Sequence, residues 1–512
     1  MAFEIFFANF QAYRWKNVLE NCLFATAILL TVPLFNSKKT KAFLVNFYFL
    51  VFVGCLFFES VFFYLFNTIF TASAIFIIIE TNASEALEFL GFYLDFPILF
   101  FFLALVIITF FYLKTPKQSF FKKRKWNIKL ITIFLFVAIL VGLKFTGLIV
   151  PNLPYLTAKA VSDYVAEQQK MERFHLDRHI GDFENVKNNS PAEKSTYVLI
   201  IGESTTRNHL GIYDYSRNTT PKLGEIANEL LLYQKVISPH TYTIEALKKT
   251  LLLDGSSAVQ LMNQAGFKTF WFSNQQPLGP FDSMVTEMAQ AADVLKFTNS
   301  NRHARKTPLD GVLLPYLEKA LNDPADKKFI VLHLLGTHLD YANRYPENFE
   351  FFTKTPKGKF TSETAVSAIN SYDNAVRYID WLVRETIEKT REQHVSSYVL
   401  YFSDHGEEVY QDRDFAGHTL SKATKNMFEI PFILWRSEKF KKENVFYEGN
   451  LNKPYVTNNF IFSLADLSQI DFAKMNEEKS IFSENFMPKK RIVGEGIDFD
   501  EHFKTTTRSK NP

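Results

Sequence analysis

The chemistry of this chain can be traced from one carboxylate, Glu203, which follows an apolar run. Residues 197–201 read YVLII and predict a buried strand that ends at Gly202. Open α/β sheets build their sites at the carboxyl ends of their strands, so a carboxylate delivered there is a candidate functional group. Further polar side chains stand in motifs elsewhere in the chain and could join it: Thr243, His338, Asp404, His405 and His418.

Asp404 and His405 are adjacent in the sequence SDHGEE, which follows the strand-like run 398–402. Neighbouring side chains on a strand point to opposite faces, so these two can converge only on a loop. With Glu203 they make three protein ligands of the kinds that zinc prefers, and they leave a fourth position open, as in catalytic sites. The oxygen-rich set also suits Mn²⁺ or Mg²⁺. The alternative is a hydrogen-bonded Asp–His pair that closes a turn.

Thr241 and Thr243 are candidates for a nucleophile, because residues 244–253 predict a helix that begins directly after them. A hydroxyl is a weak nucleophile at neutral pH, and coordination to a metal lowers its pKa. The N-terminus of the helix would stabilise anionic phosphoryl oxygens through its free amides. The competing interpretation is that Thr243 only caps the helix.

Strand-like and helical segments alternate from residue 196 to the end, which predicts a mostly parallel sheet with helices on both faces. The predicted strands are 196–201, 269–272, 329–335, 398–402 and 431–435. Several of them run into polar residues, namely Glu203, Asn274, His338 and the Asp404–His405 pair. Because such ends meet at one edge of a doubly wound sheet, these side chains are expected to form a single site.

The first 150 residues differ from the rest, because Phe, Leu, Ile and Val crowd them. A bilayer core of about 30 Å needs about 20 apolar residues per helix. The candidate spans are 18–35, 42–66, 92–113 and 128–150, with 67–79 as a short fifth. We therefore expect a multidomain protein: a transmembrane helical domain over residues 1–150, an interfacial connector and linker over 151–195, and an α/β domain over 196–512.

Basic residues set the expected topology. Six Lys and Arg residues lie between positions 114 and 125, so this loop should be cytoplasmic, and the last span should carry the α/β domain to the far side. Five spans place the N-terminus inside, where Arg14 and Lys16 fit the rule. Four spans would instead bring the lysines of 38–41 inside and put the N-terminus outside.

Net charge and cysteine content say little about the partners of this protein, but they bear on disulfides. The formal net charge of +3 neither indicates nor excludes an anionic partner. Cys22 and Cys55 are the only cysteines, and both lie in apolar runs. A disulfide framework in the α/β domain is therefore excluded.

Four motifs in order resemble those of the membrane-bound phosphoethanolamine transferases of Gram-negative bacteria, which belong to the alkaline phosphatase/sulfatase superfamily. They are GES-T-x-R-N from Gly202, Y-x-Y-S-R-x-T-x-P from Tyr213, T-Y-T from Thr241 and S-D-H-G-E from Ser403. The variants STTRN and PHTYTIE look most like the branch that modifies the lipopolysaccharide core. The resemblance covers the whole chain, including its apolar part.

The resemblance implies an alkaline-phosphatase-like fold, five spans and a set of site residues. The implied Zn²⁺ ligands are Glu203, Thr243, Asp404 and His405. Thr243, the second Thr of T-x-T, is the implied nucleophile. His338 and His418 match two histidines that relatives use at the phosphoryl group, where each could hydrogen-bond the phosphate, donate a proton to the leaving alcohol or bind a second metal.

The resemblance also implies substrate contacts. Thr81 and Glu85 match a loop that meets the lipid headgroup in relatives, and Asn274 resembles a site asparagine. The chain departs from some relatives near both places, with Ile77 in place of an Asn and with Gln275 and Leu278 in place of Ser and Lys. Asp373 matches a family helix and is expected to be mostly structural. Arg207 and Arg217 are candidates for contacting anionic acceptor groups.

The reaction that the resemblance implies is transfer of phosphoethanolamine from phosphatidylethanolamine to lipid A, the lipopolysaccharide core or another envelope acceptor. It would proceed through a phospho-threonine-type intermediate and two in-line displacements. We expect a monomer that binds no nucleic acid. It would be a multi-pass protein of the bacterial inner membrane, held in the bilayer with its catalytic domain in the periplasm.

Three other functions are weighed against this one. A sulfatase would need Cys or Ser in a C/S-x-P-x-R sequence, which the T-Y-T region lacks. A glycerol-phosphate transferase of the lipoteichoic acid type shares the architecture and the Thr nucleophile, and is the main alternative. A non-catalytic envelope scaffold would tolerate Thr243→Ala, whereas a transferase would not.

Overall fold

The computed structural model describes residues 12–66, 75, 78, 81, 83–115, 126–149, 152–172, 175–276, 284–299, 307–443 and 449–508. The chain forms two compact units. The helical unit contains residues 1–79 and 93–168, and the α/β unit contains residues 80–92 and 169–512. The short segment 80–92 therefore belongs to the α/β unit, although apolar helices precede and follow it in the chain.

The helical unit consists mainly of long apolar helices. They are α2 (Ala12–Thr31), α3 (Lys38–Phe66), α6 (Phe96–Lys114), α7 (Trp126–Phe145) and most of α8 (Leu153–Glu172), with a 3-10 turn η1 (Val32–Leu34). In the described residues, Lys38–Leu65, Phe96–Lys114 and Trp126–Phe145 are long and apolar enough to cross a bilayer, and Val18–Leu34 is a shorter apolar helix. Most of the predicted segment 67–79 lies outside the described residues, so the count of five spans stays a prediction.

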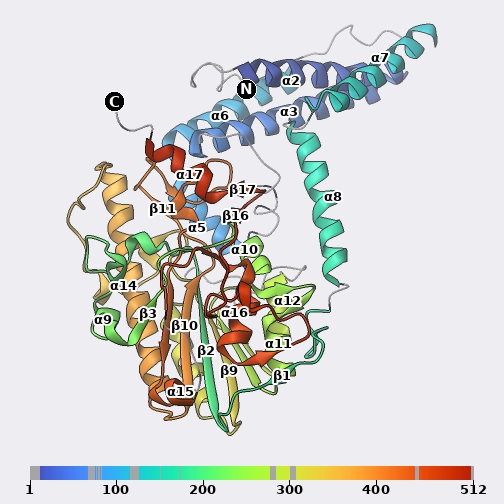
Figure 1. The fold of residues 1–512 in the computed structure, drawn as a ribbon. Coiled ribbons are helices and arrows are strands. Elements are labelled where there is room, and N and C mark those ends of the chain that lie inside the picture. Colours follow the sequence, from blue (N-terminus) through green and yellow to red (C-terminus); the bar gives the residue numbers. More distant parts are fainter. Residues whose placement is uncertain are drawn as a thin grey trace. The chain divides into compact units, whose positions relative to one another are not determined.

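A seven-stranded sheet forms the centre of the α/β unit (Figure 1). In spatial order its strands are β3 (Leu230–Leu232), β13 (Phe432–Arg436), β10 (Ser396–Ser403), β2 (Ser195–Gly202), β9 (Lys327–His333), β7 (Lys268–Ser273) and β8 (Val294–Phe297). Neighbours from β10 to β8 pair in parallel, whereas β13 is antiparallel to both β10 and β3. The predicted mostly parallel sheet is confirmed.

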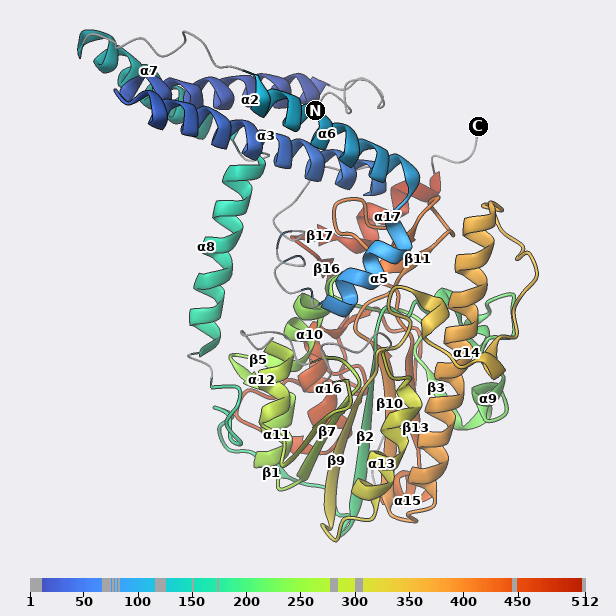
Figure 2. The ribbon, with the colours of Figure 1, turned by 180° about the vertical axis from the view of Figure 1, so that it is seen from behind.

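Alternate residues of β2 pack on opposite faces of the sheet, as the period of a strand requires. Tyr197, Leu199 and Ile201 join one buried apolar cluster, and Val198 and Ile200 join the other. The first face is covered by α10 (Thr243–Leu251), α11 (Ala258–Gln264), α12 (Met284–Gln290), α15 (Glu438–Glu443) and α16 (Phe460–Leu467). The second face is covered by α13 (Leu314–Leu321) and α14 (Glu363–Arg391) (Figures 1 and 2). Burial on both faces explains why the central strands read as continuous apolar runs.

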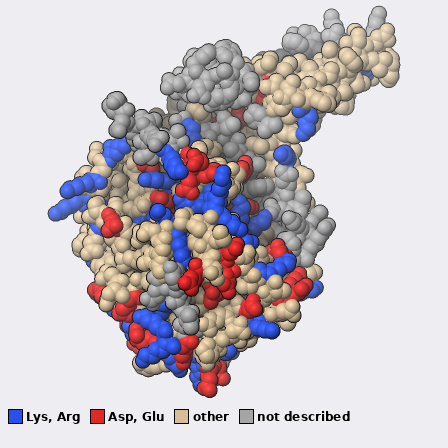
Figure 3. All heavy atoms as spheres, viewed as in Figure 1, with Lys and Arg blue, Asp and Glu red and all other residues tan. Residues whose placement is uncertain are grey.

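Charged side chains of both signs lie on the surface of the α/β unit on the face shown in Figure 3. Shorter elements complete this unit. The helices are α5 (Ala83–Tyr93), α9 (Pro221–Gly224) and α17 (Phe499–Arg508). The paired short strands are β1 (Lys187–Asn188) with β15 (Ile470–Asp471), β4 (Val236–Ile237) with β14 (Tyr455–Val456), β5 (Leu252–Leu253) with β6 (Ser256–Ser257), β11 (Glu408–Val409) with β12 (Ala416–Gly417), and β16 (Ile492–Val493) with β17 (Ile497–Asp498). The 3-10 turns are η2 (Arg207–His209), η3 (Gly211–Tyr213), η4 (Ala227–Glu229), η5 (Asp310–Leu313), η6 (Tyr341–Asn343), η7 (Glu347–Phe349), η8 (Lys425–Met427), η9 (Thr457–Asn459) and η10 (Glu477–Lys479).

Candidate metal-dependent active site

The parallel pairing of β2 and β10 brings their carboxyl ends to the same level. Gly202 lies opposite Ser403 in the register, so Glu203 and Asp404 leave the sheet side by side. The backbone N–H of Asp404 donates to the carbonyl of Gly202 at 3.0 Å, and the N–H of Ser204 donates to Asp404 Oδ1 at 3.0 Å. Two strands that are far apart in the sequence thus fix both carboxylates at one edge of the sheet.

The neighbouring strand β9 leads into a turn that touches Glu203 directly. Gly336 has a φ of +57°, and a Cβ built there would lie 2.6 Å from the carbonyl oxygen of Glu203. A side chain is therefore excluded at this position both by backbone conformation and by space. Asp310 accepts hydrogen bonds from the N–H groups of Leu335 and Gly336, which holds this turn against Glu203.

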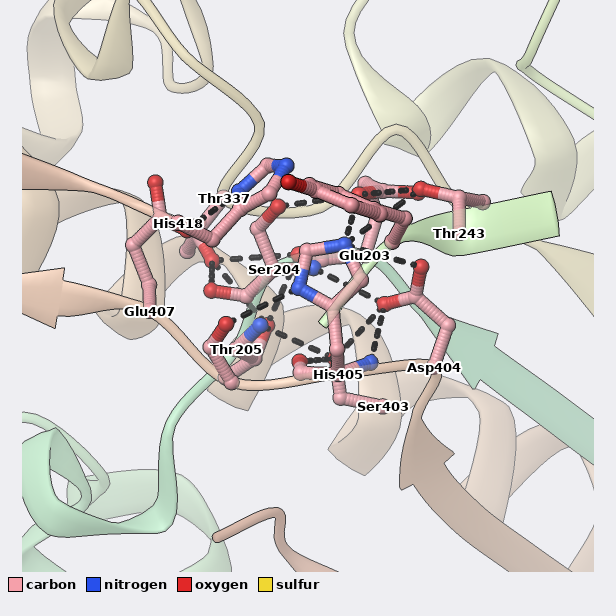
Figure 4. A network of polar contacts seen from close by, with 12 residues as sticks. Glu203, Ser204, Thr205, Thr243, Thr337, Ser403, Asp404, His405, Glu407 and His418 are labelled. Atoms are coloured by element: carbon pink, nitrogen blue, oxygen red, sulfur yellow. Dashed lines mark hydrogen bonds and ion pairs between the residues drawn. The ribbon is translucent and has the colours of Figure 1, made fainter. Parts of the chain in front are cut away.

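Four predicted ligands converge beyond these strand ends, and their side chains point toward one another in Figure 4. Thr243 Oγ1 lies 3.2 Å from Glu203 Oε1, 3.1 Å from Glu203 Oε2 and 3.4 Å from His405 Nε2. His405 Nε2 lies 3.4 Å from Glu203 Oε1 and 3.4 Å from Asp404 Oδ2. We call Glu203, Thr243, Asp404 and His405 the ion cluster. Ligand atoms of its two carboxylates and its imidazole all lie within 4.8 Å of one another, close enough to hold one metal ion.

The ion cluster is buried and carries negative charge that the chain does not neutralise. Glu203 and Asp404 are each 1% exposed, and in the described part of the chain no Lys or Arg hydrogen-bonds to either of them. Asp404 Oδ2 has no hydrogen-bond partner among the described residues. Two buried carboxylates beside a single imidazole leave a net negative charge, and a bound metal ion is the usual solution.

The electrostatics of His405 support the same conclusion. Burial opposes a charge on its ring, but the carboxylates of Asp404 and Glu203 outweigh burial and raise the pKa of His405 to about 10. Burial together with the charge of Glu203 raises the pKa of Asp404 to about 6. His405 Nδ1 lies 2.8 Å from the carbonyl oxygen of Gly406, to which it must donate. Its Nε2 is thereby left to face the cluster, where it would lose its proton on binding a metal ion.

Thr243 occupies the first position of α10 and does not cap this helix. Tyr242 is the N-cap residue, and its side chain makes no capping hydrogen bond. The Thr243 hydroxyl points instead into the ion cluster, where it donates to Glu203. Thr241 is buried, and its hydroxyl has no hydrogen-bond partner among the described residues. The geometry therefore favours Thr243 over Thr241 as the nucleophile.

His418 lies beside the ion cluster and is held by a carboxylate that the sequence analysis did not single out. The ring centroids of His418 and His405 are 4.3 Å apart, and His418 Nδ1 lies 2.8 Å from Glu407 Oε2. His405, Glu407 and His418 form a second group whose ligand atoms lie within 4.8 Å of one another. Burial, with the charge of His405, lowers the pKa of His418 to about 3, so its ring is neutral at physiological pH.

Sequence and structure comparisons identify the family of this chain. A sequence profile of the sulfatase family matches residues 195–470. The chain belongs to the sulfatase family. This family membership concerns the fold, and the sequence C/S-x-P-x-R is absent around Thr243.

Relatives that match more than four fifths of this chain are phosphoethanolamine transferases. The chain is 29% identical over 468 residues to "Phosphoethanolamine transferase EptC" of Escherichia coli K12, which covers 83% of this chain and 80% of that protein. The crystal structure of the periplasmic domain of E. coli EptC in complex with Zn matches with a TM-score of 0.60 and 32% identity, over 63% of this chain and 97% of that one. The Kdo(2)-lipid A phosphoethanolamine 7''-transferase of Salmonella typhimurium is 28% identical over 284 residues, which cover 50% of this chain and 49% of that protein.

The fold likeness extends to the helical unit. The integral membrane protein lipooligosaccharide phosphoethanolamine transferase A of Neisseria meningitidis matches with a TM-score of 0.65 over 91% of this chain and 97% of that one. Its identity of 21% makes this a likeness of fold. The predicted combination of an apolar helical region with a sulfatase-family α/β domain is confirmed.

His338 lies in the loop after β9 and is partly buried. Burial and the positive charge of Arg344 lower the pKa of His338 to about 3, and the charges of His418, His405 and Asp404 also act on it. Its Nδ1 has no hydrogen-bond partner among the described residues. His338 is thus a neutral, unsatisfied imidazole within electrostatic reach of the ion cluster.

The structure does not bring Asn274 to the ion cluster. Its side-chain amide donates to the Pro308 carbonyl at 2.8 Å and to Asp310 Oδ1 at 2.9 Å, and its oxygen accepts from Thr298 Oγ1 at 2.7 Å. These contacts make it a support for the Asp310 turn. The next residue, Gln275, reaches the cluster instead, with Nε2 3.3 Å from Glu203 Oε2. No pattern in the sequence indicated that Gln275, and not Asn274, would reach the cluster.

The remaining predicted contacts fall elsewhere. Thr81 is a half-buried residue just before α5, and Glu85 lies in α5 with a side chain outside the described part of the structure. Arg207 pairs with Glu429 at 2.6 Å, and Arg217 pairs with Asp373 at 2.8 Å. Both arginine side chains are about 15% exposed and serve internal ion pairs, so neither presents a free guanidinium to an acceptor.

Proposed function

We propose that this protein is a zinc-dependent phosphoethanolamine transferase. It moves phosphoethanolamine from phosphatidylethanolamine to lipid A or to the lipopolysaccharide core through a covalent intermediate on Thr243. The observation that carries the proposal is the convergence of the Thr243 hydroxyl with two buried carboxylates and an imidazole. The family relatives support the transferred group and the acceptor class, because their names describe phosphoethanolamine transferases and a lipid A substrate.

The ion cluster fits Zn²⁺ by its donor set. Glu203, Asp404 and His405 supply two oxygens and one nitrogen, and Thr243 stands at the fourth position. A bound Zn²⁺ would lower the pKa of the threonine hydroxyl and offset the negative charge of a phosphoryl group. The zinc complex of the EptC domain supports zinc as the metal.

The chain's own residues can carry the transfer. Thr243 Oγ attacks the phosphorus of the donor lipid, and the bond from phosphorus to the diacylglycerol oxygen breaks. Glu203 Oε2, 3.1 Å from the hydroxyl, can take the threonine proton. The proton taken from Thr243 must reach the departing alkoxide oxygen. The neutral rings of His338 and His418 could relay it, each accepting a proton at one ring nitrogen while donating one from the other. An acceptor hydroxyl or phosphate then attacks the phospho-threonine, which restores the Thr243 hydroxyl.

The setting of the reaction follows from the apolar helices. We propose that the helical unit anchors the protein in the bacterial inner membrane and that the α/β unit works in the periplasm as a monomer. A lipid donor is then available at the bilayer surface. We retain the division into residues 1–150, 151–195 and 196–512 as a proposal for domain boundaries, with segment 80–92 as an addition to the catalytic part. Thr81 and Glu85 remain proposed substrate contacts, whereas the buried Asn274 is proposed to support the Asp310 turn.

The decisive experiment compares Thr243→Ala with Thr241→Val in the purified full-length protein. The protein is incubated with headgroup-labelled phosphatidylethanolamine and lipid A or core lipopolysaccharide, and the products are analysed by mass spectrometry. We expect Thr243→Ala to transfer nothing and to carry no phosphoethanolamine adduct, because no hydroxyl remains in the ion cluster. Thr241→Val, which alters a buried hydroxyl two residues away, should retain most activity.

A panel of donor lipids tests the alternative. Phosphatidylglycerol in place of phosphatidylethanolamine should give no product if the proposal is right. Transfer of glycerol phosphate would instead identify the glycerol-phosphate transferase, which the relatives do not favour. Full transfer by the Thr243→Ala variant would show that Thr243 is not the nucleophile.

A further inference from the structure

The helix α5 packs on the loop that carries His338. Within the α/β unit, α5 contacts this loop, residues 338–344, through two of its own side chains, Glu88 and Phe92. In the chain, α5 stands between α3 and α6, both of which contain candidate membrane spans. A segment that connects apolar helices therefore touches the loop next to the ion cluster.

The first contact is an ion pair between Glu88 and Arg344. The Arg344 side chain is only 2% exposed. Its guanidinium donates to Glu88, to the carbonyl of His338 at 3.2 Å, to the carbonyl of Leu339 at 2.8 Å and to Thr307 Oγ1 at 2.6 Å. One planar group thus joins α5 to the backbone of the catalytic histidine.

The second contact continues to the other histidine. The ring of Phe92 meets the ring of Tyr341 edge-on, with centroids 6.0 Å apart. Tyr341 is 1% exposed, and its hydroxyl donates to Glu407 Oε1 at 2.8 Å. The other oxygen of Glu407 lies 2.8 Å from His418 Nδ1. Tyr341 therefore connects α5 to the carboxylate that orients His418.

We propose that Arg344 and Tyr341 are positioning residues of the transferase, and that α5, by binding both, sets the placement of His338 and His418. This inference rests on the proposed function, because it concerns the step in which these histidines act. Both positioning residues act through another group, Arg344 through backbone carbonyls and Tyr341 through Glu407.

The burial of Arg344 makes the link sensitive to Glu88. A buried guanidinium without its carboxylate shifts toward other acceptors or toward water. Since Arg344 holds the carbonyls of His338 and Leu339, such a shift moves the histidine. A displacement of about 1 Å at a reacting group can cost up to about a hundredfold in rate. Docking of α5 would therefore couple the segment between the apolar helices to the rate of transfer.

The test uses the full-length protein with zinc, a labelled phosphatidylethanolamine and lipid A, and compares Glu88→Asp, Glu88→Gln and Tyr341→Phe. For Glu88→Gln we expect kcat to fall about tenfold, with KM for the donor within about twofold and zinc content unchanged. Glu88→Asp keeps the charge and should recover part of the loss. Tyr341→Phe keeps the ring contact with Phe92 and loses only the hydroxyl, so kcat should fall about fivefold.

The matched control is Glu229→Gln, which removes the carboxylate from another Glu–Arg pair in the same unit, 2.8 Å from Arg391. It should lower stability without changing kcat per folded, zinc-loaded protein. The inference is overturned if Glu88→Gln and Tyr341→Phe keep the wild-type kcat, or if Glu229→Gln loses as much kcat as Glu88→Gln. A wild-type protein that transfers nothing overturns the proposed function together with this inference, whereas an active wild type with unaffected variants overturns only the inference.

Discussion

Two buried clusters in the α/β unit join a histidine to a carboxylate, and they differ in how the charge is neutralised. In the first, Asp373 accepts from His209 Nδ1 at 2.6 Å, from Arg217 at 2.8 Å and from the Tyr215 hydroxyl at 3.0 Å. Both of its oxygens are satisfied and a guanidinium supplies the positive charge. In the ion cluster, Asp404 Oδ2 has no hydrogen-bond partner among the described residues, and the second carboxylate nearby is Glu203.

The difference separates a structural cluster from a candidate site. In the Asp373 cluster the carboxylate is satisfied within the chain and Arg217 balances its charge, although Nε2 of His209 has no hydrogen-bond partner among the described residues. The ion cluster holds two carboxylates against one imidazole whose pKa they raise to about 10, so it attracts a cation from outside the chain. Burial of a histidine and an acid is therefore no sign of function by itself, and the missing internal cation is the informative feature.

The largest expected effect comes from removing one charge from the ion cluster. Glu203→Gln keeps the shape of the side chain but weakens the metal site and removes the proposed proton acceptor of Thr243. We expect transfer to fall by at least about a thousandfold, which corresponds to about 4 kcal/mol in the barrier. Turnover of labelled lipid and zinc content by mass spectrometry measure this directly.

Adding metal to chelator-treated protein tests whether Glu203 contributes to metal binding. Zn²⁺ at about 100 times its Kd should stabilise the wild-type α/β unit by about 2.7 kcal/mol, because it binds only the folded state. Glu203→Gln should show a much smaller rise in Tm. If Glu203→Gln binds zinc and transfers phosphoethanolamine as well as the wild type does, the ion cluster does not depend on a cation. The proposed contrast with the Asp373 cluster then fails.

The second prediction concerns the Asp373 cluster, where a substitution should lower stability and leave activity nearly unchanged. Asp373→Asn leaves Arg217 without its carboxylate in a site where the Asp373 side chain is fully buried. We expect the free energy of unfolding to fall by about 3 kcal/mol, as for other broken buried ion pairs, while turnover per folded protein stays within about threefold. Chemical unfolding and turnover are measured on the same sample.

The matched control for this change is Asp326→Asn, which alters an aspartate whose side chain is 65% exposed and which pairs with Lys194 on the surface. It should change stability by less than about 1 kcal/mol. A large loss of turnover in Asp373→Asn without a loss of stability would place Asp373 in the catalytic machinery, and the contrast between the two clusters would fail.

The sequence predicts the convergence of the ion cluster because sheet topology alone requires it. Apolar runs that end in Glu203 and Asp404 belong to parallel strands, and parallel strands end at one edge. The choice of Thr243 over Thr241 needed the resemblance, since both precede the same helix. The structure agrees with the resemblance here, as Tyr242 takes the N-cap position and the Thr243 hydroxyl turns to Glu203.

Long-range partners could not be predicted. Glu407 and Glu408 are adjacent in SDHGEE, yet Glu407 holds His418 while Glu408 accepts from Thr424 and Asn426. Asp310 draws the side chain of Asn274, the predicted site asparagine, away from the cluster. Its neighbour Gln275, for which no role was predicted, reaches Glu203 instead. These outcomes depend on which loop meets which strand end, and local patterns do not encode that.

Another buried carboxylate, Asp380 on α14, tests whether buried carboxylates in this fold need a cation. Its oxygens accept from the N–H groups of Lys222 and Leu223, at 2.8 and 2.9 Å, in the first turn of α9. Burial outweighs these two hydrogen bonds and the charge of Arg377, with Glu225 adding to the effect, and raises the pKa of Asp380 to about 7. Asp380 is thus satisfied like Asp373 but has no buried cation bonded to it among the described residues.

The raised pKa predicts how stability depends on pH. Between the unfolded pKa of 3.8 and the folded value of about 7, the folded state holds a proton that the unfolded state lacks. The stabilising effect of the neutral form is therefore complete below about pH 4 and is lost as the pH rises through 7. Relative to the wild type, Asp380→Asn should gain stability from pH 5 to pH 7, by at most about 1.4 kcal/mol per pH unit.

Unfolding of the full-length protein in excess zinc at pH 5, 6 and 7 measures the difference, with Asp326→Asn as the control that should show none. A constant difference would mean that the two amides keep Asp380 ionised throughout, and that a buried carboxylate in this fold needs no cation as long as its hydrogen bonds are made.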